Sequence, residues 1–372
     1  MAIHPRASLP FSMGGSTSRP APALEAASTG RTHLSFDVLW RVPVGCGFSG
    51  FFVEVALGYL PALASEGVSV KMLSGACSEA FLSAQLTAED ASTFRAAWVD
   101  EQRLTDAQTA ASLLVEHGEP CGHRSWSNAA ASGRPNAAAS GRSNAAASGR
   151  PWRVVARAMS EGDLSPSNAA CLSRVDEVWV PTSWHVERFV SAGVKRSAIH
   201  VLPEAVDTDF FRPDHPAVAQ ALLARGRRAA FTFVSVFKWE SRKGWDLLLD
   251  AYWREFDRAT PVRLVLKTYL PSWEPGPRDL QEHVEMHARR VHRSSTRSLP
   301  PVELVVEDAS RAAMRELYAS ADAFVLPTRG EGWGLPVCEA MAMGVPPIVT
   351  NFSGPTAYLT RHNSHPLPVA AH

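Results

Sequence analysis

Short apolar runs typical of buried strands alternate with helical patterns along most of this chain. Most runs are hydrophobic at successive positions, as expected for strands that are buried on both faces of a sheet. Alternating strands and helices over this length predict the α/β class, with open parallel sheets wrapped by helices. Beyond residue 151, the predicted strands are Trp152–Met159, Glu177–Pro181, Ile199–Leu202, Ala230–Phe237, Val262–Tyr269, Val302–Glu307, Ala323–Leu326 and Val345–Thr350. The predicted helices between them are Trp184–Ala192, Gly244–Asp257, Arg278–Val291, Ser310–Ser320 and Leu335–Met343.

A strand, a glycine-rich loop and a helix open the ordered part of the sequence. His33–Val42 predicts a strand, Gly45–Gly50 a glycine turn, Phe51–Ala64 an apolar helix and Val68–Leu73 a second strand. This order is typical of a βαβ unit. At roughly 100–200 residues per domain, the 372 residues suffice for two domains, each with its own core.

Composition and prolines predict the domain limits. Residues 1–32 are rich in Ser, Pro, Ala and Gly, which is typical of a disordered tail, although a transit peptide shares this composition. The best boundary, Val206–Ala217, divides an N-terminal domain of residues 33–210 from a C-terminal domain of residues 211–372. Within the first domain, residues 127–151 repeat the unit Asn-Ala-Ala-Ala-Ser-Gly-Arg, which predicts a flexible low-complexity insertion.

Charge and cysteine content exclude several classes of protein. The 37 basic and 37 acidic side chains balance, so no overall field attracts nucleic acid. No apolar run reaches the 18 or more residues that a membrane-spanning helix needs. The five scattered cysteines include no C-x-x-C, which argues against a disulfide scaffold or zinc ribbon and favours a reducing compartment. We therefore expect a cytoplasmic location, with organelle targeting by residues 1–32 left open.

The most informative segment is Arg329–Gly344. It comes after a predicted buried strand and consists of a glycine-rich loop and a predicted helix. Glycines let backbone N–H groups approach a ligand, and the N-terminus of a helix favours negative charge, so the segment suits a phosphate. Pro336 fits the first helical turn. The carboxylates of Glu331 and Glu339 are poor phosphate ligands but good acceptors for sugar hydroxyls. The alternative is an ordinary turn followed by a surface glutamate.

A second segment, Phe231–Gly244, also joins a strand to a helix through a loop. Lys238, Arg242 and Lys243 stand at the carboxyl end of the predicted strand, where ligands bind in open α/β sheets. These cations could neutralise a diphosphate without a metal. The alternative is a solvated basic loop.

Together, the two segments resemble the group-1 (family 4) retaining glycosyltransferases of the GT-B fold. Glu331 and Glu339 match the E-x7-E pattern of that family within an E-G-[FW]-G-L-P context, and Lys243-Gly244 matches its K-G. Lys238 stands where the family usually has an arginine. The resemblance covers about Arg174–Pro366, with further matches at Val175–Trp184, Pro203–Thr208 and Asn351–Pro355.

The resemblance implies a fold, a reaction and a set of site residues. It implies two Rossmann-like domains facing a cleft and the transfer of a hexosyl group, with retention, from a nucleotide sugar to a hydroxyl acceptor on a glycan, lipid or protein. No metal or other cofactor is expected. The predicted catalytic residues are Glu331, Lys243 and Lys238. Donor binding would involve Lys238 and Lys243 at the diphosphate, Glu339 at the ribose, Glu331 at the transferred sugar, and the backbone of Gly332, Trp333, Gly334 and Leu335.

Residues on the acceptor side are less well marked. Gly47 lies in the glycine loop of the predicted N-terminal domain, Glu161 follows a buried strand, and His117 ends a short apolar run. Each is a candidate for contact with substrate, and for His117 a hydrogen-bonded structural role is the alternative. Family members usually continue past the position of Pro366, so the sequence resembles a truncated member.

Other interpretations stay open at this point. A non-catalytic or degenerate sugar-nucleotide-binding protein is one, and another GT-B enzyme such as a phosphorylase is a second, although no pyridoxal phosphate lysine site is identified. Three histidines on one predicted helix, His283, His287 and His292, predict a solvated face rather than a metal site. The side chains of Trp239, Trp245 and Trp333 would either stack on a ligand or pack in the core.

Overall fold

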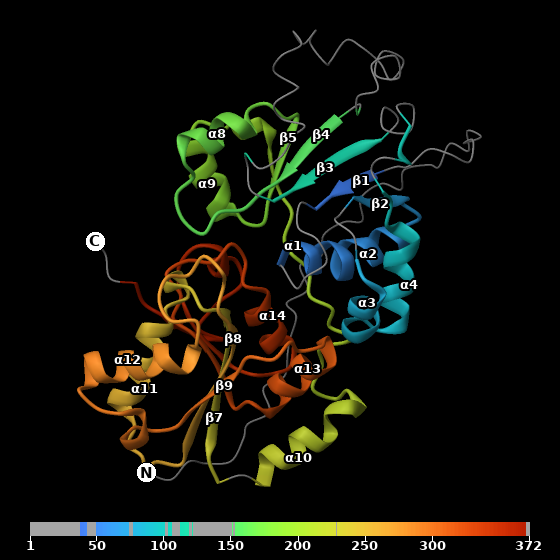
Figure 1. The fold of residues 1–372 in the computed structure, drawn as a ribbon. Coiled ribbons are helices and arrows are strands. Elements are labelled where there is room, and N and C mark those ends of the chain that lie inside the picture. The colour runs from blue at the N-terminus through green and yellow to red at the C-terminus, as the bar shows by residue number, and fades with distance from the viewer. Residues whose placement is uncertain are drawn as a thin grey trace. The chain divides into compact units, whose positions relative to one another are not determined.

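Two six-stranded sheets with helices on their faces make up the computed structural model (Figure 1). The structure describes residues 38–42, 50–73, 77–100, 103–105, 112–118, 121, 151, 153–227 and 229–369. Neighbouring strands are parallel in both sheets. Both sheets lie within one compact unit, Phe36–His372. The predicted α/β class is confirmed.

The first sheet has the strand order β2-β1-β3-β4-β5-β6. Its strands are β1 Val38–Arg41, β2 Val70–Leu73, β3 Leu113–His117, β4 Arg153–Arg157, β5 Glu177–Val180 and β6 Ile199–Val201. The predicted apolar helix is present as α1 (Gly50–Val53), a π-helical turn (Glu54–Tyr59) and α2 (Leu60–Ser65). Among the described residues of this part of the chain, the other α-helices are α3 Glu79–Gln85, α4 Ala88–Ala97, α8 Pro166–Leu172 and α9 Ser183–Ser191. The strand β3 and the helices α3, α4 and α8 were not predicted from the sequence.

The second sheet has the order β12-β11-β10-β7-β8-β9, so the chain reverses its direction of travel across the sheet between β7 and β10. Its strands are β7 Phe231–Lys238, β8 Val262–Tyr269, β9 Val302–Val305, β10 Ala323–Leu326, β11 Pro347–Thr350 and β12 His365–Leu367. The helices are α10 Ala219–Arg227, α11 Trp245–Glu255, α12 Leu280–His292, α13 Arg311–Ser320 and α14 Leu335–Ala342. All but β12 and α10 follow the predicted ranges closely, because buried β-branched runs and amphipathic helices leave strong patterns.

Several predicted features fall outside the described residues. These are the N-terminal tail, the repeat insertion and the glycine loop that contains Gly47. The predicted boundary Val206–Ala217 lies in the connection between β6 and α10. Within the described ranges, no helix is long and apolar enough to cross a bilayer.

Cysteine pairing differs from the sequence-based expectation. Cys121 and Cys171 form a disulfide that joins the segment after β3 to α8, and Cys77 is disulfide-bonded too. The pair is separated by 50 residues in the sequence, so no short spacing could reveal it. The sequence argued against a disulfide scaffold and did not predict these individual disulfides.

Gly244 lets two loops of the second sheet approach each other. Its φ of 69° is left-handed, and a Cβ placed there would lie 2.0 Å from the carbonyl oxygen of Pro327, just after β10. A backbone oxygen cannot move away as a flexible side chain could. Glycine is therefore required where the loop after β7 meets the loop after β10.

We expect Gly244→Ala to destabilise the fold more than Gly67→Ala. Both glycines have a left-handed φ, but a Cβ added at Gly67 would have no atom within 4 Å. The control therefore suffers only backbone strain of about 1–3 kcal/mol, whereas Gly244→Ala adds a backbone clash. Thermal unfolding of both variants measures the difference. Equal losses of melting temperature would mean that the loops separate at little cost.

Candidate functional site

The candidate site lies where β7 and β10 end side by side, at the reversal in strand order. Ligands of open α/β sheets bind in the crevice at such a point, at the carboxyl ends of the strands. The loop after β7 supplies Lys238, Arg242 and Lys243, and the loop after β10 leads through the glycines into α14. The fold therefore brings together the two segments that the sequence singled out.

An ion pair between Lys243 and Glu331 joins these two loops. Lys243 Nζ lies 2.7 Å from Glu331 Oε1 and 2.8 Å from Oε2. The hydroxyl of Thr328 donates to Oε1 at 3.0 Å, and Arg242 Nη1 lies 3.7 Å away. Glu331 is only 5% exposed, so its charge depends on these partners.

The backbone around Glu331 is also fixed. Its N–H donates to Ser353 Oγ at 2.9 Å, and its carbonyl accepts from the N–H of Gly354 at 3.0 Å. Gly334, with a φ of 97°, then turns the chain into α14 and has no side chain to cap the helix. No side chain of the N-cap residue accepts hydrogen bonds from the first N–H groups of α14. These donors suit an anionic ligand.

Glu339 lies in the middle of α14, in an environment unlike that of Glu331. Burial raises the pKa of Glu339 to about 7, although the hydrogen bond from Tyr318 and the charge of Arg311 lower it. Tyr318 Oη donates to Oε2 at 2.6 Å. The site thus holds one carboxylate paired with a lysine and one paired with a neutral phenol.

Lys238 ends β7 and is partly buried. Among the described residues it has no ion-pair partner, and its ammonium lies 5.7 Å from the centre of the Trp273 ring. The cation is thus available to a ligand. Trp333, beside the glycine loop, packs against Tyr358, whose hydroxyl donates to the Trp333 carbonyl at 2.7 Å.

The acceptor-side candidates have different surroundings. Glu161 lies 3.3 Å from Arg242, and its carbonyl oxygen would be 2.2 Å from a Cβ at Gly330. This segment therefore packs directly on the glycine loop. Both ring nitrogens of His117 lie near polar atoms, Nδ1 at 3.3 Å from Trp40 Nε1 and Nε2 at 3.2 Å from Glu54 Oε2. The geometry at His117 thus fits the structural alternative.

A buried charged cluster surrounds Glu54 and was not predicted from the sequence. Arg157 donates to Glu54 Oε1 through Nε at 3.0 Å and Nη2 at 2.6 Å. Burial alone would raise the pKa of Glu54, but His117 and Arg157 lower it to about 2. Burial and the charge of Glu54 raise the pKa of Glu204 well above its usual range. A charged residue inside an apolar helix or strand was the available signal for Glu54 and Arg157.

Other side chains that were considered as ligand groups serve packing. Trp239 is fully buried and stacks on Trp245 at 4.6 Å between ring centres. The expectation of a solvated histidine face on α12 is wrong, because His287 is buried and binds Asp250 at 2.8 Å, with His292 at 3.2 Å from the same oxygen. The carboxylate comes from α11, which the sequence of α12 does not show. No metal-binding group of three or more ligands occurs among the described residues.

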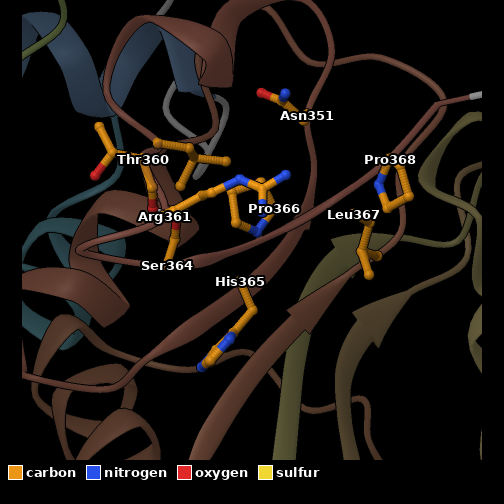
Figure 2. Close-up of a pocket in the computed structure, with 9 residues that line it drawn as sticks. Asn351, Thr360, Arg361, Ser364, His365, Pro366, Leu367 and Pro368 are labelled. Carbon is orange, nitrogen blue, oxygen red and sulfur yellow. Dashed lines mark hydrogen bonds between the residues drawn. The ribbon is translucent and has the colours of Figure 1, made fainter.

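A pocket of about 570 Å³ lies at the β11–β12 side of the second sheet (Figure 2). Thr360, Arg361 and Ser364 gather on one side of it and Leu367 on the other. None of the predicted site residues lines this pocket.

Comparison with known proteins agrees with this geometry. Residues 228–371 match the sequence family described as Glycosyl transferases group 1. Over these residues the chain is similar to group-1 glycosyltransferases, and its fold is of the GT-B type. The family match covers both loops of the candidate site, so the predicted resemblance is confirmed for this domain.

Two curated relatives share part of the sequence. A GDP-mannose-dependent alpha-(1-6)-phosphatidylinositol monomannoside mannosyltransferase of Mycobacterium tuberculosis is 33% identical over 205 residues, which are 52% of this chain and 48% of that protein. Mannosylfructose-phosphate synthase of Agrobacterium fabrum is 28% identical over 164 residues, 44% of this chain and 34% of that protein. The chain thus matches between a third and half of the length of these relatives.

Solved structures confirm the GT-B fold. HepE of Anabaena, in complex with UDP-glucose, has a TM-score of 0.58 at 14% identity, covering 87% of this chain and 83% of that one. The α,α-trehalose 6-phosphate synthase of Burkholderia multivorans has a TM-score of 0.56 at 14% identity, covering 90% and 87%. At this identity the likeness concerns the fold alone.

We expect Lys243→Ala to destabilise the part of the fold built on the second sheet, and Glu331→Gln to restore part of the loss. Removing one partner of a buried ion pair costs about 3–5 kcal/mol because the remaining charge is unpaired. Thermal unfolding of both single variants and the double variant gives the coupling. The control pair is Arg188 and Asp163, which lie 3.2 Å apart with side chains 43% and 84% exposed, and its coupling should be about 0–1 kcal/mol. Equal couplings would contradict the buried pair's role.

We expect Glu339→Gln to stabilise the free protein at alkaline pH. The folded pKa of Glu339, about 7, lies above the unfolded value, so wild-type stability falls as pH rises between the two, while the Gln variant does not titrate. The amide oxygen can still accept from Tyr318. Thermal unfolding should show the gain of the variant growing from pH 5 to pH 8, on the order of 2 kcal/mol. A gain independent of pH would contradict the buried carboxylate.

Proposed function

We propose that the chain transfers a hexosyl group from a nucleotide sugar to a hydroxyl acceptor, with retention of anomeric configuration and without a metal. The observation that carries the proposal is the meeting of a basic loop, a glycine loop and an uncapped helix at the reversal in strand order. Cations and helix N–H groups suit a diphosphate, and carboxylates suit sugar hydroxyls. A nucleotide sugar contains both chemistries in one molecule.

Each side chain has a proposed role in donor binding. Lys238 and Lys243 would contact the diphosphate, together with backbone N–H groups of residues 332–335. Glu339 would accept hydrogen bonds from the ribose, and Glu331 from the transferred sugar. Because Lys243 already pairs with Glu331, one lysine would orient the carboxylate and contact the diphosphate at the same time.

The chemistry follows from charge. As the bond between the sugar and the diphosphate breaks, its electron pair stays on the diphosphate, and positive charge develops at the sugar. The acceptor hydroxyl oxygen then bonds to the anomeric carbon, and its proton passes to the departing diphosphate. Fixed cations stabilise the departing diphosphate, and a buried carboxylate stabilises the sugar. Three basic side chains in one loop supply the positive charge that a divalent metal would otherwise bring.

The compared proteins support the donor class. One relative is named as GDP-mannose-dependent, and HepE was solved with UDP-glucose. Glu161 is the proposed acceptor-side contact, because it lies against Arg242 and the glycine loop.

The proposal is tested by incubating the purified chain with UDP- and GDP-linked hexoses in EDTA, with sugar-alcohol and glycoside acceptors. We expect donor hydrolysis or transfer that survives chelation, and a product whose anomeric configuration, measured by NMR, equals that of the donor. Activity that requires added Mn²⁺ or Mg²⁺ would contradict metal independence, and an inverted product would contradict retention.

Two glutamate variants test the division of roles. Glu331→Gln should spare affinity for UDP or GDP and impair turnover, because its proposed partner is the sugar. Glu339→Gln should lower the affinity for UDP or GDP by about ten- to a hundredfold, which corresponds to the loss of one hydrogen bond to a charged group. The exposed Glu255→Gln is the control. Equal losses of nucleoside diphosphate affinity in the two site variants, measured by calorimetry, would contradict the division.

A further inference from the structure

Trp273 is the most exposed large apolar side chain described, with 66% of its surface accessible. It lies in the loop between β8 and α12. A single exposed apolar residue is common in proteins and by itself indicates nothing. The residues around Trp273 are what suggest a role in ligand binding.

Trp273 lies beside an available cation at the ligand edge of the sheet. The ammonium of Lys238 is 5.7 Å from the centre of its ring, and Lys238 pairs in register with Tyr269, the last residue of β8. The carboxyl ends of β7 and β8 thus carry a lysine, a tyrosine and a tryptophan next to one another. Tyr269 is also 44% exposed.

The loop that carries Trp273 is held in place by a backbone hydrogen bond within the loop and by the side chain of His283 in α12. The N–H of Glu274 donates to the Pro271 carbonyl at 3.2 Å, and His283 Nε2 lies 2.8 Å from the Pro277 carbonyl oxygen. Gly276, with a φ of 108°, fits closely over the His283 ring. The loop is therefore positioned without burying Trp273, and no ring–ring contact of Trp273 occurs among the described residues.

We propose that Trp273 is the stacking surface for the base of the nucleotide sugar. The inference rests on the proposed function, in which Lys238 binds the diphosphate. In a nucleoside diphosphate, a planar base is joined through the ribose to the phosphates, and the exposed indole beside Lys238 offers a flat apolar face next to the cation. Every base has a π-face, so stacking adds affinity with little dependence on which base the nucleotide carries.

The test separates the base from the phosphates. Affinities for UDP, GDP and inorganic pyrophosphate are measured by calorimetry for wild type, Trp273→Ala, Trp273→Phe and Lys238→Ala. Stacking worth about 1–3 kcal/mol per base corresponds to a loss of roughly 5- to 150-fold. We expect Trp273→Ala to lower the affinity for UDP and GDP by this factor and to leave the affinity for pyrophosphate unchanged. Trp273→Phe, which keeps an aromatic ring, should retain most of the wild-type affinity for UDP and GDP. Lys238→Ala should lower the affinity for all three ligands.

Trp98, 38% exposed after α4, provides the control variant Trp98→Ala, which should bind all three ligands like wild type. Unchanged UDP and GDP affinity in Trp273→Ala would overturn the inference and leave the proposed function standing. An equal loss for pyrophosphate would also overturn it, because the tryptophan would then act by holding Lys238. If wild type binds neither nucleoside diphosphate nor nucleotide sugar, the proposed function itself fails.

Discussion

The close approach of the loops after β7 and β10 is the constraint on which the candidate site depends. Gly244 allows it, since any Cβ there would meet the Pro327 carbonyl, and the Lys243–Glu331 ion pair stabilises it. The same contact brings a basic loop and a glycine loop to one end of one sheet. Stability and the proposed ligand binding therefore depend on the same few residues, and changes at these positions are expected to alter both.

Buried charge is a shared feature of both sheets. In the first sheet, Glu54 forms an ion pair with Arg157 and lies 3.2 Å from His117, and in the second, Glu331 forms an ion pair with Lys243. Glu339 has no ion-pair partner within the described part of the chain, and burial raises its pKa to about 7. An uncharged or half-charged carboxyl in a helix that follows a glycine loop is a costly arrangement, typical of a functional site. A protein selected only for stability would replace such a group.

The comparisons and the geometry agree on the second sheet and say less about the first. The family match begins at residue 228, close to the start of β7. The first sheet has the parallel order expected of a Rossmann-like half, but its candidate residues follow no motif of comparable specificity. His117 is held within a buried cluster, whereas Glu161 contacts the glycine loop.

The sequence by itself determined the α/β class, nearly all elements of the second sheet and the two segments of the candidate site. These depend on local patterns, namely buried β-branched runs, glycine loops and helix starts, which are readable without the fold. Only the tertiary structure decided which charges meet. The Lys243–Glu331 pair, the Glu54–Arg157 cluster, the Cys121–Cys171 disulfide and the His287–Asp250 contact join residues that are 37 or more positions apart. Side-chain partners at such separations are set by strand order and loop approach, and no local pattern records either.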